Sequence, residues 1–339
     1  MRRTLRELAS KALWALGPTR PARAGRGRLT VVTFHRVLPA GLRSAYPFPG
    51  LVVTPEELEW FLAFFRMHYA IDTLANAVAR WDDADPDGAP RLAVTFDDGQ
   101  VDNFEYARPI LDKAGVKATF FVASAHVEQA APLWHDRLGF AALAALERRE
   151  RGLSEMLGAL GIPVSGDSSQ IPGLLANRLK AFPPEERDRW IARAESVAGA
   201  PVLPAWDGMM TWDQLRMLQR AGHEIGSHSE THPILPQCTD SELAREISGS
   251  KALLEERLGV EVATFCYPNG DFDARVAAAV ACAGYHQAVT TRGGPNRPGA
   301  SRFELGRCDI VAEHSATRDG GLSEATLAWR LSGLHPGLG

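Results

Sequence analysis

Short apolar runs alternate with amphipathic patterns of helical period along most of the chain. β-rich apolar runs predict strands at residues 28–37, 91–96, 117–124, 223–228, 262–268, 286–291 and 302–310. Helices are predicted between them at 54–68, 103–115, 211–222, 239–259 and 273–284. Because strand and helix alternate, we expect parallel strands joined by helical crossovers. About seven strands in this length favour an α/β barrel over an open sheet.

The alternation is interrupted between 134 and 208, where charged helical segments occur without a clear strand. We therefore predict a barrel domain at 28–312 that carries a helical insertion at 133–208. A C-terminal tail is expected at 313–339. The insertion either covers the functional site or binds a partner, and its sequence does not distinguish these two roles.

Residues 1–27 are predicted to form a basic helix and a linker rich in Pro, Gly and Arg. Three interpretations of the helix remain open: it lies on an anionic membrane surface, packs on the domain, or is a frayed tail. Apolar and basic residues interleave there at helical spacing, namely Leu5, Leu8, Ala12, Leu13 and Leu16 with Arg2, Arg3, Arg6 and Lys11.

The same stretch makes a poor signal peptide, because Glu7, Ser10 and Lys11 interrupt its apolar residues. The sequence contains no apolar run of about 18 residues that would predict a transmembrane helix. We therefore expect a location in the cytoplasm or at the membrane of the cell envelope.

Composition narrows the classes of function. The chain has 339 residues and a formal net charge of -4, so nothing in its charge suggests a nucleic-acid partner. None of its four cysteines belongs to a C-x-x-C pair. A disulfide framework or a cysteine zinc site is therefore not expected, and buried thiols are the better interpretation.

Polar residues gather where the predicted strands end. Barrel enzymes assemble their active sites at the carboxyl ends of the strands, and the coincidence of several polar residues there predicts a functional site. The candidates are His35, Asp97, Asp98, His228, His232, Tyr267, Pro268, Asn269 and Arg307.

His228 and His232 lie in "GSHSETHP", where Gly226 and Pro233 predict a loop or one short turn rather than a helix. Two neutral imidazoles with one carboxylate form a site with open positions for water and substrate. Such a set suits Zn²⁺, and also Fe²⁺, Co²⁺ or Ni²⁺. The alternative is that both are surface histidines in a polar loop.

"TFDDG" at 95–99 together with "HSETH" at 228–232 resembles the polysaccharide deacetylase family, also called the NodB-homology deacetylases. "TFFVAS" and "WDQLRMLQRAGHEIGSH" are also typical of that family, and the resemblance extends from about Leu29 to Ile310. It implies a distorted (β/α) barrel of about seven strands.

The resemblance also implies roles for individual residues. Asp98, His228 and His232 would bind a divalent metal, and Asp97 would be the general base that takes a proton from metal-bound water. A backbone N–H in the turn 268–270 would stabilise the oxyanion. Tyr267, Asn269 and Arg307 are expected to contact the substrate.

The sequence departs from the family pattern in two places. Many members have an arginine that orients the catalytic aspartate, but Cys266 stands at that position, so we expect Arg307 or Arg302 to supply the charge. A C-terminal leucine-x-histidine motif, whose histidine is the general acid, has no clear equivalent. "FHRV" instead resembles the branch of poly-N-acetylglucosamine deacetylases, in which the acid follows the first strand. This implies His35 as the general acid, the alternative being an inert histidine at the barrel rim.

Three functions are compatible with these motifs. The leading hypothesis is a metal-dependent deacetylase of an N-acetylated aminosugar polymer, either an exopolysaccharide or a lipid-linked precursor. The second is a deacetylase or deformylase of a lipid-linked aminosugar. The third is a catalytically inactive carbohydrate-binding barrel. The presence of all four residues of the two motifs argues against it, namely Asp97, Asp98, His228 and His232.

Overall fold

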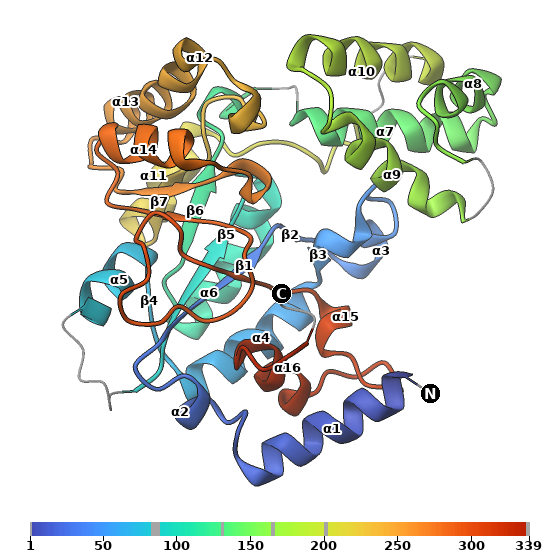
Figure 1. Cartoon of the computed structure of the whole chain (residues 1–339). Helices are drawn as coiled ribbons and strands as arrows, with labels where there is room; N and C mark the ends of the chain where they lie inside the picture. The colour runs from blue at the N-terminus through green and yellow to red at the C-terminus, as the bar shows by residue number, and fades with distance from the viewer. Residues whose placement is uncertain (1, 83–88, 130–131, 164–166, 200–202, 337–339) are drawn as a thin grey trace.

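A curled, parallel sheet forms the centre of the molecule (Figure 1). The computed structural model describes residues 2–82, 89–129, 132–163, 167–199 and 203–336. Neighbouring strands follow the order β10-β1-β5-β6-β7-β8-β9, and a parallel bridge between Val289 and Leu305 brings β9 back towards β10. The predicted distorted barrel is therefore confirmed. Its strands are β1 (Leu29–Phe34), β5 (Arg91–Phe96), β6 (Thr119–Val122), β7 (Glu224–Ser227), β8 (Thr264–Cys266), β9 (Gln287–Val289) and β10 (Cys308–Asp309).

The strand predicted at 302–310 is wrong in its length, because only β10 within it is a regular strand. The N–H of Glu304 donates to the carbonyl of Ser301, which forms a turn, and the N–H of Arg307 donates to the carbonyl of Arg292. The strand predicted at 28–37 is divided at His35 into β1 and β2 (Arg36–Val37). Two short strands of the described residues were not predicted: β3 (Val52–Val53) and β4 (Ala70–Asp72). Of these, β4 pairs with the first half of β5, whereas β6 pairs with its second half.

Helices cover the outside of the sheet, and their apolar faces form the main core with the strands. The helix after Thr54 begins with a capping box, since Thr54 Oγ1 accepts from the N–H of Glu57 and Glu57 accepts from the N–H of Thr54. The helices are α3 (Ala40–Arg43), α4 (Pro55–His68), α5 (Leu74–Asp82), α6 (Arg108–Ala114), α11 (Trp212–Arg220), α12 (Asp240–Ala244), α13 (Ser250–Leu258) and α14 (Ala274–Cys282). π-helical turns lie at Asn103–Ala107 and Arg245–Gly249, and 3-10 turns at Pro49–Leu51, Ser124–His126, Ser168–Gln170, Leu235–Gln237 and Pro268–Gly270.

In its described residues, the predicted insertion contains four helices with a hydrophobic core of their own. They are α7 (Trp134–Glu147), α8 (Arg151–Ala159), α9 (Ile171–Leu179) and α10 (Pro184–Ala198). A buried arginine joins the insertion to the barrel. Arg36 donates to Asp102 and to Asp207, each at 2.8 Å, and its guanidinium lies 4.0 Å from Asp136 at the start of α7. Figure 1 shows the insertion as a separate group of helices beside the strands.

The two ends of the chain pack together on the barrel (Figure 1). The segment expected to be a tail contains α15 (Ala312–Ser315) and α16 (Glu324–Leu331), and Leu327 and Leu331 of α16 are buried in the main core. The predicted N-terminal helix is α1 (Arg2–Leu16), which packs against α16, and the linker after it contains α2 (Pro21–Ala24). Within the described ranges, no helix has the length and apolarity needed to cross a membrane.

Candidate active site

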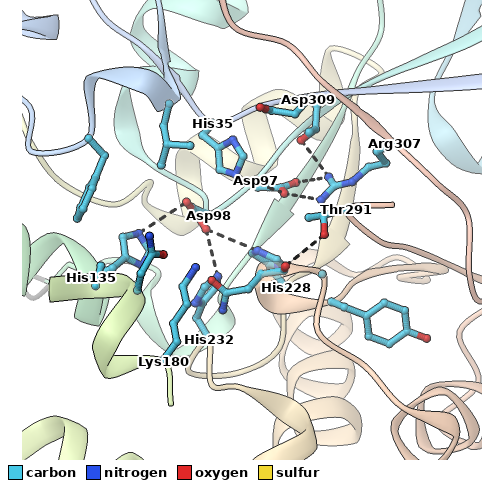
Figure 2. Close-up of a pocket in the computed structure, with 18 of the residues that line it drawn as sticks. His35, Asp97, Asp98, His135, Lys180, His228, His232, Thr291, Arg307 and Asp309 are labelled. Carbon is cyan, nitrogen blue, oxygen red and sulfur yellow. Dashed lines mark hydrogen bonds and ion pairs between the residues drawn. The ribbon is translucent and has the colours of Figure 1, made fainter. Parts of the chain in front are cut away.

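Two adjacent carboxylates follow β5, and both line one cavity (Figure 2). The N–H of Asp97 donates to the carbonyl of Phe34 at 3.0 Å, which fixes the end of β5 beside β1. Neighbouring residues of a regular strand point to opposite faces, but Asp98 has a left-handed backbone with a φ of 76°. This turn brings both side chains to the cavity. A non-glycine residue in this region costs about 1–3 kcal/mol, so the surrounding contacts must hold Asp98.

His228 and His232 converge on the carboxylate of Asp98. Their Nε2 atoms lie 3.6 and 3.5 Å, respectively, from Asp98 Oδ1. Nδ1 of His228 is 2.8 Å from the carbonyl oxygen of Cys266. Because a carbonyl only accepts, Nδ1 carries the proton, and the Nε2 lone pair is left free to bind a metal.

The loop that carries His232 is fixed by the buried carboxylate of Glu246. This carboxylate accepts from the N–H of Glu230 at 3.0 Å, the N–H of Thr231 at 2.8 Å and the hydroxyl of Thr231 at 2.6 Å. Ser229 Oγ accepts from the N–H of His232 at 3.0 Å. Ser229 and His232 have positive φ values of 65° and 59°, so the segment is a non-helical loop, as predicted.

The donor set fits a divalent transition metal. Burial lowers the pKa of His228, and burial with the neighbouring histidines holds the pKa of His232 well below its usual value. Both imidazoles are therefore neutral and able to act as ligands. Two ligands about 2.1 Å from one tetrahedral ion are about 3.4 Å apart, and both His-to-Asp98 separations are close to this spacing.

A buried arginine is paired with Asp97. Nη1 and Nη2 of Arg307 donate to the two carboxylate oxygens, each at 2.7 Å. Burial by itself would raise the pKa of Asp97, but the guanidinium holds that pKa well below its usual range. Sγ of Cys266 lies 3.1 Å from Nη2 of Arg307. The positive charge beside Asp97 therefore comes from Arg307 in the segment before β10. Cys266 occupies the position on β8 where many family members have an arginine.

The other predicted residues lie around the same cavity. Nε2 of His35 is 3.9 Å from Asp97 Oδ2, and its side chain is partly exposed. Asn269 has a left-handed backbone in the 268–270 turn, and a Cβ at Gly270 would collide with Thr291. Tyr267 is fully buried, and its hydroxyl donates to the carbonyl of Phe303 at 3.0 Å.

The expected substrate contacts of Tyr267, Asn269 and Arg307 stay predictions. The Arg307 guanidinium already donates to Asp97, Thr33 and Thr95, and it is 2% exposed. Of the three, Asn269 is the most accessible from the cavity, because it alone is not fully enclosed.

The insertion supplies one wall of the cavity, which has a volume of about 450 Å³. His135 from the start of α7 and Lys180 from the end of α9 reach the cavity (Figure 2), and Nε2 of His135 lies 4.0 Å from Asp98 Oδ2. Asn177 of α9 also lines the cavity. Burial lowers the pKa of the Lys180 ammonium, an effect that Asp271 opposes. The sequence did not reveal these residues, because each is isolated within a helical pattern and has no motif around it.

Comparison with known proteins agrees with this geometry. Residues 84–288 match the model of a family described as polysaccharide deacetylase. A stretch of 79 residues is 33% identical to chitin deacetylase 1 of Cryptococcus neoformans. This stretch covers 23% of the present chain and only 17% of that longer protein.

Solved structures show the same fold at low sequence identity. The deacetylase PplD of Streptococcus pyogenes, in complex with acetate, aligns with a TM-score of 0.58 and 18% identity over 90% of this chain and 98% of that chain. IcaB of Ammonifex degensii aligns with a TM-score of 0.56 and 17% identity over 89% and 95%. A de-N-acetylase from Aggregatibacter actinomycetemcomitans aligns with a TM-score of 0.52 and 16% identity over 83% and 94%.

Proposed function

Since this chain belongs to the polysaccharide deacetylase family, we propose that it hydrolyses the N-acetyl groups of an aminosugar polymer with a divalent metal. One observation carries the proposal. The metal-ligand set of Asp98, His228 and His232 and the buried pair of Asp97 with Arg307 meet in a single cavity. An inactive binding barrel would not require a charged carboxylate to be stabilised beside an open metal site.

Different residues of the cavity have different roles in amide hydrolysis. Asp98, His228 and His232 would hold the metal, whose chemistry when bound is to polarise a carbonyl and lower the pKa of water to about 7. Asp97 is ionised because Arg307 pairs with it, and it accepts the proton of the water whose oxygen adds to the amide carbon. Its low pKa makes it a weak base, so we expect turnover to depend strictly on the metal.

The remaining groups act on the oxyanion and the leaving amine. Within the described chain, no backbone hydrogen bond uses the N–H of Asn269, which borders the cavity. We assign it as the donor to the oxyanion. His35 lies beside Asp97, on the side away from His228 and His232 (Figure 2). It gives a proton to the nitrogen as the C–N bond breaks, which yields acetate and a free amine.

The cavity supports an aminosugar as the group that is bound. Its volume of about 450 Å³ falls within the range of about 300–1,000 Å³ that is usual for ligand sites. Polar groups from the insertion, His135, Asn177 and Lys180, line the same cavity as Asn269 and Thr291. We infer that these groups bind sugar hydroxyls around the acetamido group.

The test is acetate release from N-acetylglucosamine oligomers by purified protein that has been stripped with a chelator and then reloaded with Zn²⁺ or Co²⁺. We expect no release from the stripped protein and recovery with either metal. Lack of metal-dependent release from any aminosugar polymer would refute the proposal. Release from a lipid-linked aminosugar alone would favour the second hypothesis, and oligomer binding without release would favour the inactive barrel.

Two variants test the assigned roles. Asp97→Asn should still bind the metal but lose turnover, whereas loss of the metal would show that the two aspartates have been assigned the wrong way round. His35→Ala should lower the rate by about 10²–10⁴-fold, the usual contribution of a general acid. His286→Ala is the matched control, because His286 is exposed beside Glu261 on the surface. A rate near wild type for His35→Ala would exclude its role as the acid.

A further inference from the structure

Helix α1 packs with polar residues facing the domain. Ser10 is fully buried, and its hydroxyl hydrogen-bonds with Thr326 of α16 at 3.1 Å. The carboxylate of Glu7 accepts from the N–H of Arg318 at 3.3 Å. The ring of Trp14 packs on Phe64 of α4. These contacts fix the orientation of α1 on the barrel.

The opposite side of α1 is apolar and exposed. Leu5 is 61% exposed, Leu8 is 60% exposed and Leu16 is 76% exposed. At 3.6 residues per turn these three leucines fall within roughly 80° of one another around the helix. Ala12 and Ala15 lie on the same side and are also exposed. A surface helix normally buries its apolar stripe, so this reversed orientation indicates a surface that binds something.

Basic residues flank this apolar face. Residues 1–28 contain eight Lys and Arg and one acidic residue, although the whole chain has a net charge of -4. Arg6 is exposed on one side of the leucines, and Lys11 is exposed on the other. Such a combination complements anionic lipid headgroups over an apolar layer. A second copy of the chain would instead bring two basic helices together, with repulsion between like charges.

We propose that α1 docks the protein on an anionic lipid bilayer, with Leu5, Leu8 and Leu16 inserted below the headgroups. Arg6 and Lys11 then lie at the level of the phosphates. Because α1 is already folded against α16 and α4, docking does not have to order the helix. It also holds the barrel at one fixed orientation to the membrane.

The test is co-sedimentation of the full chain with vesicles of phosphatidylcholine that contain about 30% phosphatidylserine, an anionic lipid. We expect wild type to bind these vesicles and to remain in solution with pure phosphatidylcholine. Added salt should weaken the binding. The triple variant Leu5→Gln, Leu8→Gln, Leu16→Gln should lose at least about tenfold in partitioning. Gln is a good helix former, so α1 should be retained.

The control is the double variant Met217→Gln, Val260→Gln, which removes exposed apolar side chains on other elements and should bind like wild type. Acetate release from soluble oligomers should be equal in all three proteins. Equal vesicle binding by the Leu variant, or no binding by wild type, would overturn the proposal. So would a wild-type dimer that is abolished in the Leu variant, measured by light scattering, because the face would then bind a second copy.

Discussion

Replacement of Arg307 by methionine tests the most exacting feature of the site. The guanidinium makes two hydrogen bonds of 2.7 Å to Asp97, and both side chains are almost fully enclosed. Methionine keeps much of the volume but leaves a buried carboxylate without its partner. Removal of one member of a buried ion pair costs about 3–5 kcal/mol, so we expect a loss of this size in the free energy of unfolding at neutral pH.

The loss in the free energy of unfolding of Arg307→Met should depend on pH, and the pKa of Asp97 sets the direction of this dependence. In wild type the pKa of Asp97 lies below its ordinary value of 3.8, so its contribution to stability is present above that pH and is lost as the pH falls through the lowered pKa. Without Arg307, burial raises the pKa of Asp97. The variant's deficit relative to wild type should therefore be smallest near and below pH 3.8 and should grow as the pH rises to neutral.

Replacement of Arg307 should also change the kinetics of the enzyme, independently of its effect on the free energy of unfolding. A base that is protonated over a wider range and no longer fixed in orientation should lower kcat/KM by about 10²–10⁴-fold. It should also move the acidic limb of the pH profile to higher pH. Urea unfolding at several pH values and acetate release measure the two effects.

Arg292→Met is the matched control. Its ion pair with Glu304 lies on the surface, so its removal should cost at most about 1 kcal/mol. An Arg307→Met protein with wild-type kcat/KM and an unmoved acidic limb would refute the role of Arg307 in positioning Asp97.

Three further outcomes are expected. Cys266→Arg should destabilise the wild-type chain, because Cys266 Sγ is 3.1 Å from Arg307 and leaves no room for a second guanidinium. In the Arg307→Ala background the same change should restore part of the activity, and no restoration would mean that a guanidinium from β8 cannot reach Asp97. Glu246→Ala should weaken Zn²⁺ binding by about 10–100-fold in calorimetry, because the loop of His232 loses its anchor; unchanged affinity would contradict this. Arg36→Met should lower the free energy of unfolding by about 3–5 kcal/mol, since its buried guanidinium pairs with three carboxylates; a change below about 1 kcal/mol would refute this estimate.

The barrel and the two pairs of polar residues that meet in the cavity could be predicted because their signals are local. Asp97 and Asp98 are adjacent, and His228 and His232 are four residues apart, so each pair lies on one strand end whatever the register. The partner of Asp97 is 210 residues away in sequence. The choice between Arg302 and Arg307 depends on a turn that the sequence pattern represented as a continuous strand.

The contributions of the insertion could not be predicted for a different reason. Helical period shows which residues share a face, but it does not show how a group of helices docks on a barrel. His135 and Lys180 reach the cavity only because of that docking. The same limit applies to α1, whose period reveals an apolar face without showing that Leu5 and Leu8 point away from the domain.

The buried Arg36 cluster has a consequence for engineering. Arg36 directly follows His35, and Asp136 and Asp207 reach it from the two ends of the predicted insertion. Asp102 also accepts from the N–H of Val37 at 2.6 Å. A chimera that exchanges residues 133–208 for a loop would remove two of the carboxylates that pair with the Arg36 guanidinium, next to His35, the proposed general acid. The insertion therefore cannot be exchanged for an arbitrary segment, and a replacement that preserves function would have to retain both aspartates.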